Sequence, residues 1–246
     1  MSGHSKWSQI KRQKGVADIK RGTIFSRLGN AITLAAKRGG GNPTANFTLR
    51  MAIEKARTAN MPKENIERAV KRGAGELGGA QIEEVIYEGI GPSGIGIIIE
   101  VATDNKNHAS ATIKNTLSQY GGKLASSGAV TYQFQRMGKL VIDPAGKSAE
   151  EIELNIIDAG AQDFEEEGEL VVCYTRPAEL EKVKKMLEGQ GTAIREATLT
   201  WEPNNFVNIT NKVLAEKILK LMSSLEDLEE VVAVYSNFDL PKEFLS

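Results

Sequence analysis

The first third of the chain places apolar residues at helical spacing in three consecutive segments. In residues 23–38, apolar positions recur every three or four residues, which is typical of one buried helix face. The same spacing returns in residues 46–60. A third helix is expected to begin at Met61-Pro62, because proline suits the first helical turn, and to end at 71–73. The expected inward positions are Ile24, Leu28, Ala31, Ala35, Leu49, Ala52, Ile53, Ala56, Ile66, Ala69 and Val70. Three short amphipathic helices predict a small helical bundle.

After a glycine-rich stretch at 73–80, the pattern changes to short apolar runs separated by turn residues. The sequence Gly91-Pro92-Ser93-Gly94 is a turn signal between two such runs, so it predicts a hairpin. The expected elements are strands at 85–87 and 95–101, a helix at 105–120 with Ile113 and Leu117 inward, and a strand at 123–134 that breaks or bulges at 126–128. This segment is therefore only ββαβ.

Residues 135–205 alternate strand-like and helix-like patterns. The expected elements are strands at 139–142, 163–166, 170–174 and 193–201, a helix at 149–159 with Ile152, Ile156 and Ile157 inward, and a helix from Pro177 with Leu180, Val183, Met186 and Leu187 inward. The order βαββαβ is that of a ferredoxin-like α+β unit.

A last helix at 211–225 and a last strand at 231–235 cannot bury their apolar faces alone. The expected inward positions of this helix are Val213, Leu214, Ile218, Leu221 and Met222. Either the pair completes the earlier ββαβ sheet, with the βαββαβ unit inserted between, or it forms a separate small domain. We favour the first arrangement. The predicted fold is thus α+β and multidomain: a three-helix domain at 1–75 and two ferredoxin-like α/β domains, one formed by 81–134 plus 206–240 and the other, at 135–205, inserted in it.

Charge divides the chain into two opposed parts. Residues 1–75 hold 16 Lys and Arg against 4 Asp and Glu, a net charge of +12, whereas residues 76–246 carry a net charge of −13. Such asymmetry indicates a polyanionic partner for the basic part. Two of the predicted helices end on basic residues, which complementarity to the helix dipole also explains. That explanation does not cover the basic residues before the first helix.

Residues 1–21 form a basic arm whose large apolar residues before Val16 are Trp7 and Ile10. So little apolar surface predicts an arm that is flexible when free. An indole among cations suits a nucleic acid, because cations meet phosphates while the ring stacks on a base. The alternative is that Trp7 packs on the helices that follow. His4 is interpreted as a contact to backbone or base, not as a catalyst.

The candidate nucleic-acid-binding residues are the arm, Trp7 and the cations of the three helices. They are His4, Lys6, Trp7, Lys11, Arg12, Lys14, Lys20, Arg21, Arg27, Arg38, Arg50, Arg57, Lys63, Arg68, Lys71 and Arg72. The sequence shows no helix-turn-helix motif, because no tight turn leads into a recognition helix. The spacings therefore do not predict sequence-specific reading of the major groove.

Nothing in the sequence indicates an enzyme, a cofactor or a metal site. The two histidines stand apart at positions 4 and 108, and no zinc-protease, Cys-x-x-Cys or Gly-x-Ser-x-Gly motif occurs. The single cysteine, Cys173, lies in an apolar run and is expected to be buried and inert. The acidic runs 163–167 and 226–230 match no calcium loop, so they are interpreted as solvated faces. No apolar run approaches the roughly 18–20 residues that a membrane helix needs.

Several short motifs together resemble the YebC/PmpR family. They are Gly3-His4-Ser5-Lys6-Trp7 with Ile10-Lys11, Arg21-Gly22-Thr23-Ile24-Phe25, Asn60-Met61-Pro62-Lys63, Asn65-Ile66-Glu67-Arg68-Ala69, Tyr87-Glu88-Gly89 with Gly91-Pro92, Thr103-Asp104-Asn105 and Tyr235-Ser236-Asn237-Phe238-Asp239. The resemblance runs from residue 2 to about residue 240. It implies three domains, with the last inserted in the middle one, in a cytoplasmic protein described as a probable transcriptional regulator that binds DNA. We take this DNA-binding regulator as the leading expectation. The alternative that the resemblance implies is a ribosome-associated factor that binds ribosomal or transfer RNA and relieves stalling at proline-rich stretches.

Residues and resemblance together predict a nucleic-acid-binding regulator of gene expression, either on DNA or on RNA in the ribosome. A second class of function is a protein-interaction module, in which the acidic α/β domains dock a protein partner. The two classes differ in which part of the chain contacts the partner: the basic first 75 residues or the acidic remainder.

Overall fold

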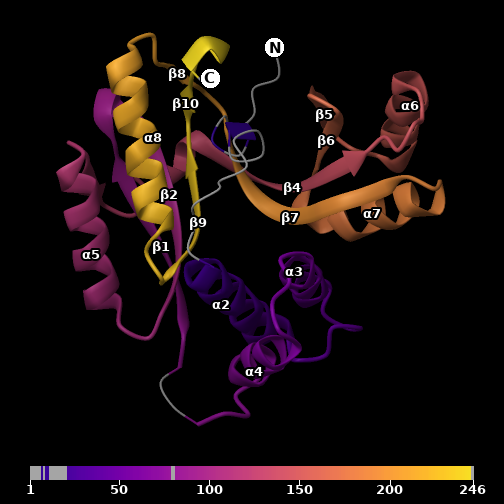
Figure 1. Ribbon diagram of the computed structural model, residues 1–246, viewed down its shortest axis with the longest axis horizontal. Coiled ribbons are helices and arrows are strands. Elements are labelled where there is room, and N and C mark those ends of the chain that lie inside the picture. Colours follow the sequence, from indigo (N-terminus) through magenta and orange to yellow (C-terminus); the bar gives the residue numbers. More distant parts are fainter. Residues whose placement is uncertain (1–6, 8, 11–20, 79–80, 245–246) are drawn as a thin grey trace. The chain divides into compact units, whose positions relative to one another are not determined.

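The computed structural model describes residues 7, 9–10, 21–78 and 81–244, and the chain divides into two compact units (Figure 1). Of the described residues, the smaller unit contains 135–202. The larger unit combines the described residues up to 134 with residues 203–244. The chain therefore leaves the larger unit once, builds the smaller one, and returns.

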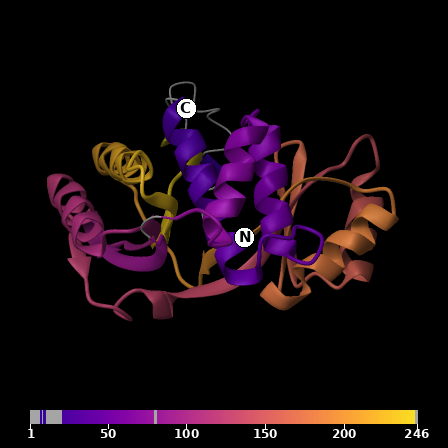
Figure 2. The same ribbon diagram turned by 90° about the horizontal axis from the view of Figure 1, so that it is seen from below.

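Three helices fill the amino-terminal part of the larger unit, as their apolar spacing predicts. They are α2 (Arg21–Gly39), α3 (Phe47–Thr58) and α4 (Lys63–Gly73). Asn46 caps α3, because its side-chain oxygen accepts a hydrogen bond of 3.0 Å from the backbone N–H of Leu49. Figure 2 shows the three helices packed side by side.

Close approach of two backbones fixes the packing of α2 against α4. A Cβ atom on Gly73 would lie 2.3 Å from the carbonyl oxygen of Thr33, so only glycine fits there. Ile32 is fully buried in this core although its position was not expected to face inward. Ala31 and Ala52 are only partly buried, so the real core stripe of each helix is shifted slightly from the predicted one.

The larger unit also holds a four-stranded antiparallel sheet with two helices. Its strands, in the order β3-β1-β2-β9, and its helices are β3 (Lys123–Ala125), β1 (Glu83–Ile90), β2 (Gly96–Thr103), β9 (Val231–Ser236), α5 (Lys106–Gln119) and α8 (Lys212–Glu226). Strand β9 pairs with β2, with Ile97 opposite Ser236 and Ile99 opposite Val234. The carboxy-terminal helix and strand therefore belong to the earlier sheet, as expected, and do not form a separate domain.

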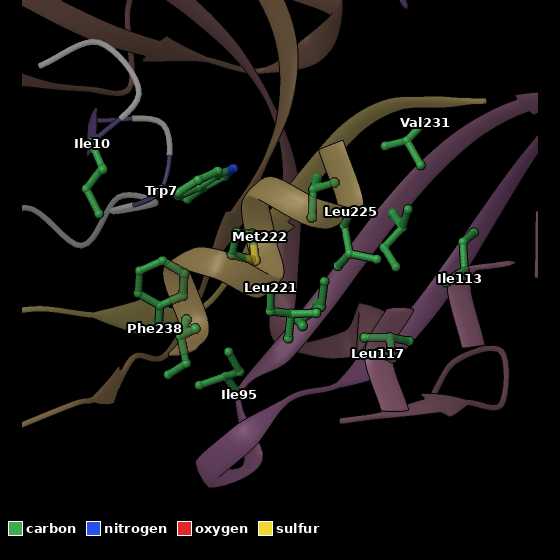
Figure 3. Close-up of a cluster of buried hydrophobic side chains, with 14 of the residues drawn as sticks. Trp7, Ile10, Ile95, Ile113, Leu117, Leu221, Met222, Leu225, Val231 and Phe238 are labelled. Atoms are coloured by element: carbon green, nitrogen blue, oxygen red, sulfur yellow. The ribbon is translucent and has the colours of Figure 1, made fainter. Parts of the chain in front are cut away.

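Strand β2 is buried on both faces and organises the core. Successive residues of a strand point to opposite faces. Ile95, Ile97 and Ile99 accordingly share one cluster with buried residues of α5 and α8 (Figure 3). Ala102 belongs to a different cluster, which contains Leu34 of α2. The three-helix part thus packs against the same sheet that α5 and α8 cover.

The smaller unit follows the predicted βαββαβ order. Its elements are β4 (Phe134–Asp143), α6 (Ala149–Ala159), β5 (Asp163–Glu167), β6 (Leu170–Thr175), α7 (Leu180–Gly189) and β7 (Ala193–Pro203). The strands are arranged as β5-β6-β4-β7. Numbered within the unit, this order is 2-3-1-4, which is the ferredoxin-like arrangement that the element order predicts.

The larger sheet has the same arrangement with one strand moved along the chain. If β1 is counted after β3, the order β3-β1-β2-β9 becomes 2-3-1-4, and α5 and α8 follow the first and third strands as in the smaller unit. Both sheets therefore have the ferredoxin-like strand order. In the larger sheet, β1 takes the place of the third strand of that order, although it comes first in the chain. This permutation explains why its sequence reads as an incomplete ββαβ segment.

The strand expected over 123–134 is wrong beyond Ala125. Residues 126–133 instead form turns and a short 3₁₀ helix, η2 (Thr131–Gln133). The buried carboxylate of Glu88 on β1 accepts hydrogen bonds from the backbone N–H groups of Gly128 (2.6 Å), Val130 (2.6 Å) and Thr131 (2.9 Å). In a strand, these N–H groups would donate to the backbone of a neighbouring strand. Here they donate to Glu88, so its carboxylate holds this segment in turns.

Three apolar residues that were expected to face inward are exposed: Ile157, Met186 and Val213. Each stands next to a more buried apolar neighbour on the same helix. Adjacent helical residues differ by about 100° in direction, so only one of them can face the core.

The remaining short elements complete the connections. They are η1 (Pro92–Gly94), η3 (Pro177–Glu179), η4 (Lys242–Phe244), and the parallel pair of β8 (Val207–Asn208) with β10 (Phe238–Asp239). Within the part of the chain that the structure describes, no helix combines the length and the apolar character needed to cross a membrane.

Candidate nucleic-acid interface

Helix α4 exposes a group of cations near its carboxyl end. Arg68, Lys71 and Arg72 are all exposed. Arg68 and Arg72 lie one helical turn apart and therefore share a face. Among the described residues, no hydrogen bond or ion pair engages the side chain of Arg68 or Lys71. These two cations are consequently available to an anionic partner.

Two contacts on α4 are too loose to remove a cation from solution. Lys63 lies 3.5 Å from Glu67 with both side chains exposed. Arg72 lies 3.9 Å from Asp104 of the sheet region, and each side chain is 45% exposed. Exposed pairs of this kind contribute only about 0–1 kcal/mol, so phosphates can compete for Lys63 and Arg72.

The two candidate arginines of α3 have different surroundings. Arg57 is exposed and, among the described residues, has no partner. Arg50 donates hydrogen bonds to the carbonyl oxygens of Pro43 (2.9 Å) and Thr44 (3.3 Å), and its guanidinium lies 5.3 Å from the centre of the Phe47 ring. Arg50 therefore fastens the connection between α2 and α3, whereas Arg57 faces solvent.

The candidate arginines of α2 are engaged by carboxylates of the α/β part of the larger unit. Arg27 is ion-paired with Glu226 (3.7 Å) and donates a hydrogen bond to the backbone carbonyl of the same residue. Its side chain is only 18% exposed. Arg38 is ion-paired with Glu84 on β1. In this structure Arg27 joins α2 to the end of α8 and Arg38 joins it to β1, and the proposed contacts of both arginines to nucleic acid stay predictions.

Trp7 is buried, with 6% of its surface exposed. Its indole Nε1–H donates a hydrogen bond of 3.0 Å to the Glu226 carboxylate, and its ring belongs to the core cluster that contains Met222 and Phe238 (Figure 3). Ile10 is buried in the same cluster. The ring is buried, as the alternative reading expects, although the core that it joins is formed with α8. Its stacking on a base stays a prediction. The expected lack of apolar packing in the arm is wrong at these two residues.

Several candidates lie outside the described part of the structure. These are His4, Lys6, Lys11, Arg12, Lys14 and Lys20. Arg21 is the first residue of α2, but the structure does not describe its side chain. Their proposed contacts to nucleic acid stay predictions.

A cleft of about 450 Å³ lies beside α4, within the larger unit. The residues that line it include Arg68 and Arg72 together with Asp104 and Glu230. Asn65 also lines the cleft, and its amide makes no hydrogen bond among the described residues. The cleft therefore offers cations, hydrogen-bonding groups and carboxylates within one concave surface.

One group of polar residues at this cleft superficially resembles a catalytic arrangement. The Glu230 carboxylate accepts a hydrogen bond from the Thr103 hydroxyl, and its other oxygen lies 3.2 Å from Nδ1 of His108. In nucleophilic catalysis the imidazole must contact the hydroxyl in order to take its proton. Here the carboxylate stands between them, so this group does not activate Thr103.

Other reactive side chains are buried or only pair with neighbours. Burial raises the pKa of the Cys173 thiol to about 12, which suppresses its thiolate. Lys106 donates to Glu83 (2.6 Å) and holds the pKa of that exposed carboxyl below its usual value. Among the described residues, no three His, Cys, Asp or Glu side chains are grouped so that they could hold a metal ion.

The two acidic runs are not simple solvated faces. Glu226 is 5% exposed and holds Trp7 and Arg27, while Glu165 is buried and accepts a hydrogen bond of 2.8 Å from the Tyr174 hydroxyl. Sequence reasoning missed Glu226 because its partners are 199 and 219 residues away. A local pattern carries no signal for such a contact. If a protein partner docks at these runs, Glu165 and Glu226 are too buried to contact it.

Family models match nearly the whole chain. One for the "TACO1/YebC protein N-terminal domain" matches residues 5–76, and one for the "TACO1/YebC second and third domain" matches residues 82–238. The chain therefore belongs to the TACO1/YebC family, which confirms the resemblance found in its motifs.

Relatives of similar length support this assignment. A "Probable transcriptional regulatory protein" of Halothermothrix orenii is 46% identical over 247 residues, which cover 100% of this chain and 98% of that protein. A protein of the same name from Aquifex aeolicus is 44% identical over 245 residues, with the same coverage. The crystal structure of a conserved hypothetical protein from Aquifex aeolicus matches with a TM-score of 0.89 and 43% identity, over 98% of this chain and 100% of that one. The names of the first two relatives describe probable regulators.

Proposed function

We propose that this chain is a nucleic-acid-binding regulator of gene expression, acting in the cytoplasm through its basic arm and its three-helix part. The observation that carries the proposal is the set of exposed cations Arg57, Arg68 and Lys71, which no carboxylate engages among the described residues. They lie in the segment of net charge +12, in a chain whose remainder carries −13. A polyanion is attracted to the first part and repelled by the second.

Binding of this kind is driven by release of counterions from the phosphates. Each phosphate that a Lys or Arg neutralises contributes about 0.9 to the slope of log K against log salt concentration on duplex DNA. If six to ten phosphates are contacted, affinity falls roughly 10³- to 10⁵-fold between 50 and 200 mM salt. Duplex DNA is the leading target, since relatives over the full length are named probable transcriptional regulatory proteins.

The test is a salt series with the full chain and fluorescently labelled duplex DNA. We expect a steep linear decrease in log affinity, and footprinting that protects a promoter fragment of the source genome against excess random duplex. Binding that is independent of salt contradicts a phosphate-based interface. Protection of random duplex to the same extent as the promoter fragment contradicts a sequence-selective DNA regulator.

The cleft beside α4 favours a second candidate, an RNA-binding translation factor of the ribosome. The carboxylates of Asp104 and Glu230 stand close to the exposed cations and repel a continuous duplex backbone. They accept hydrogen bonds from hydroxyl groups, which the 2′-OH of RNA supplies and DNA lacks. This arrangement suits isolated phosphates and hydroxyls of a folded or single-stranded RNA.

A sedimentation experiment distinguishes the two candidates. A ribosome factor sediments with ribosomal subunits in a low-salt gradient and is released at high salt, whereas a DNA regulator stays at the top. Crosslinking in cells, with sequencing of both bound DNA and bound RNA, gives an independent result. Recovery of ribosomal or transfer RNA without promoter DNA would replace the leading candidate with the second.

A further inference from the structure

A second group of exposed lysines lies on the layer that α5 and α8 form over one face of the larger sheet. The two helices contact each other and share one core with the sheet (Figure 1). Just after α5, the Tyr120 hydroxyl lies 2.8 Å from the Ser224 hydroxyl of α8. The lysines of this α5/α8 layer are Lys114 on α5, Lys123 at the start of β3, and Lys212, Lys217 and Lys220 on α8. None of them was among the cations expected to bind nucleic acid.

The five lysines are exposed and have no partner within the described ranges of the chain. No hydrogen bond, ion pair or ring contact engages any of them there. Lys106, at the start of α5, differs from them because it pairs with Glu83 at 2.6 Å. The five lysines are therefore available to an anionic partner.

This layer is basic although the chain after residue 75 carries a net charge of −13. Helix α5 contains two lysines and no Asp or Glu, and α8 contains three lysines with Glu216 and Glu226. Glu226 is 5% exposed and is already engaged by Trp7 and Arg27. In these two helices, which are described in full, Glu216 is thus the single exposed carboxylate. The negative charge of the second part is therefore concentrated outside the α5/α8 layer.

The electrostatics of the helices themselves do not account for these lysines. Cations stabilise the last turn of a helix, whereas Lys212 is the first residue of α8, and neither helix has a basic residue in its last turn. Glu216 stands four residues from both Lys212 and Lys220, a spacing that suits ion pairs, yet in the described structure it pairs with neither. Lys217 and Lys220 are neighbours on the helix surface, where their charges repel. The lysines therefore contribute little to α8, and a partner outside the helix explains them better.

The three lysines of α8 lie on the face that points away from the core. At about 100° per residue, they fall within about 140° of one another. Ile218 and Leu221, on the opposite side of the helix, are fully buried. One extended anionic partner can therefore contact the three ammonium groups together.

The other exposed side chains of the layer suit the phosphates of a nucleic acid better than a membrane. Helix α5 exposes Asn115, Ser118 and Gln119, and such polar side chains contact phosphate oxygens beside Lys and Arg in nucleic-acid complexes. A helix that binds a membrane surface needs an apolar face to insert. On α8 the exposed large apolar residue is Val213 alone. The chemistry of this layer is therefore that of a phosphate-binding surface.

The α5/α8 layer and the three-helix part contact different faces of strand β2. Successive residues of a strand point to opposite faces. Ile97 and Ile99 share the core of α5 and α8, whereas Ala102 packs with Leu34 of α2. A short, straight duplex that lies on one group of cations therefore leaves the other group free.

We propose that the lysines of the α5/α8 layer form a second phosphate-binding surface, so that the chain holds two segments of nucleic acid at once. One segment contacts the three-helix part and the other contacts the α5/α8 layer. This inference rests on the proposed function and adds a surface in the part of the chain whose net charge is negative. A folded RNA, a bent duplex or two neighbouring duplexes supplies two such segments.

The main experiment counts the short nucleic acids that one full chain binds. A DNA duplex of about 12 base pairs, little more than one helical turn, and an RNA hairpin with a stem of the same length are each titrated at low salt. Native mass spectrometry gives the number bound. We expect two copies on the unmodified chain and one on the triple variant Lys212→Gln, Lys217→Gln, Lys220→Gln. Glutamine has nearly the helix propensity of lysine, so α8 should stay folded, which circular dichroism checks.

Two charge-matched variants show whether position or net charge sets this number. The first changes three exposed cations of the smaller unit and should still bind two copies: Arg176→Gln, Lys182→Gln, Lys185→Gln. The second changes the exposed cations of α3 and α4 and should bind one copy, on the α5/α8 layer: Arg57→Gln, Arg68→Gln, Lys71→Gln. If the first variant also loses a copy, net charge sets the number, and the inference is wrong.

Glu216 allows a test of the opposite sign. In the variant that lacks the cations of α3 and α4, Glu216→Gln removes the carboxylate between Lys212 and Lys220 and should strengthen binding about 3-fold at low salt. Glu169→Gln, at an exposed position of the smaller unit, makes the same charge change and should leave affinity unaltered. Fluorescence anisotropy measures both. Equal effects of the two changes would contradict a local phosphate contact at α8.

The outcomes distinguish this inference from the proposed function. If the unmodified chain binds neither DNA nor RNA, both proposals fall. If it binds a single copy of each probe, and the α8 variant binds that copy equally well, the inference falls alone. Vesicles that contain phosphatidylglycerol provide the comparison with lipid phosphates. Vesicle binding that requires the α8 lysines, without a second nucleic acid on the chain, would make this layer a membrane surface and overturn the inference.

Discussion

Helices α2 and α4 are both rich in cations, yet their cations have opposite surroundings. On α2, Arg27 is largely buried against Glu226 and Arg38 pairs with Glu84. On α4, Arg68 and Lys71 are exposed and, among the described residues, unpaired. The first pair of cations fastens the helical part to α8 and to β1, and the second pair faces solvent.

This difference shows that a basic residue in a basic segment serves one of two purposes. A cation that meets a buried carboxylate compensates the cost of removing both charges from water, and its loss leaves the carboxylate buried and uncompensated. A cation on the surface contributes little to stability, because water already solvates it. Substitutions on the two helices should therefore separate stability from affinity.

The largest expected effect is on stability, from Arg27→Ala. This change removes the ion pair with Glu226 and the hydrogen bond to its carbonyl, while Glu226 stays buried. We expect the free energy of unfolding to fall by about 3 kcal/mol, as is typical when one partner of a buried pair is removed. Urea unfolding followed by circular dichroism measures this change. The control is Arg57→Ala on α3, an exposed arginine whose loss should cost less than about 0.5 kcal/mol. Equal losses of unfolding free energy in Arg27→Ala and Arg57→Ala would refute the division of the cations into buried, paired ones and exposed ones.

The second effect is on affinity, from the triple variant Arg57→Gln, Arg68→Gln, Lys71→Gln. The three cations are exposed and, within the described residues, unpaired. We expect stability to stay within about 0.5 kcal/mol of the unmodified chain. Affinity for duplex DNA should fall about 100-fold near 0.1 M salt, and the salt slope should flatten by about 2.7, because three phosphate contacts are lost. Fluorescence anisotropy over a salt series measures both quantities.

A charge-matched control tests whether position matters. Arg176, Lys182 and Lys185 are exposed on the smaller unit, and changing all three to Gln removes the same charge. Affinity should then change only slightly and the slope should not change. If this control flattens the slope as strongly as the triple variant of Arg57, Arg68 and Lys71 does, net charge alone governs binding, and the interface assigned to the three-helix part is wrong.

Much of the fold could be predicted because its signals are local. Apolar spacing located the helices, and turn residues located the hairpins. The βαββαβ unit followed from element order alone, since all its strands are consecutive in the chain. That the last helix and strand complete the earlier sheet followed only from counting elements, and the pairing of β9 with β2 was not predicted. The division into domains at 1–75, 81–134 plus 206–240, and 135–205 stays a prediction.

The partners of charged residues could not be predicted, because they depend on contacts far apart in sequence. Nothing near Arg27 indicates Glu226, and the acidic run around Glu226 resembles an ordinary solvated segment. Trp7 could be placed neither by spacing nor by composition, since its core is completed by α8 more than 200 residues later. Charge asymmetry thus identified the basic region but not which of its cations are accessible.

A third effect extends the comparison to a carboxylate that is compensated without a cation. Burial opposes ionisation of Glu88, but hydrogen bonds from the backbone of 128–131 outweigh it and hold its pKa below the usual 4.5. A lowered pKa in the folded state means that the ionised form stabilises the fold above about pH 4.5, and that this contribution is lost as pH falls through the folded-state pKa. We expect Glu88→Gln to lower the free energy of unfolding by about 2 kcal/mol at pH 7.

The pH dependence of that difference is the measurement. Unfolding of both chains between pH 3 and 7 should show a constant gap above about pH 5 that narrows toward lower pH, because the unmodified chain loses its ionised carboxylate there. The control is Glu84→Gln, a change at another position of β1 whose side chain is partly exposed. Its difference in unfolding free energy from the unmodified chain should be smaller. A gap that widens on acidification contradicts the lowered pKa of Glu88.

The smallest expected effect on stability comes from Arg38→Ala. It tests whether the ion pair at this end of α2 stabilises the fold as the Arg27 pair does. Arg38 pairs with Glu84, but its side chain is 46% exposed and that of Glu84 is 27% exposed, so water screens the pair. We expect a loss of less than about 1 kcal/mol, which adding 0.5 M salt reduces further. Arg27→Ala should keep most of its larger effect in the same salt, since buried pairs are screened much less. If Arg38→Ala instead flattens the salt slope of nucleic-acid binding, its pairing with Glu84 is exchanged for a phosphate on binding, and this end of α2 belongs with α4 in the interface.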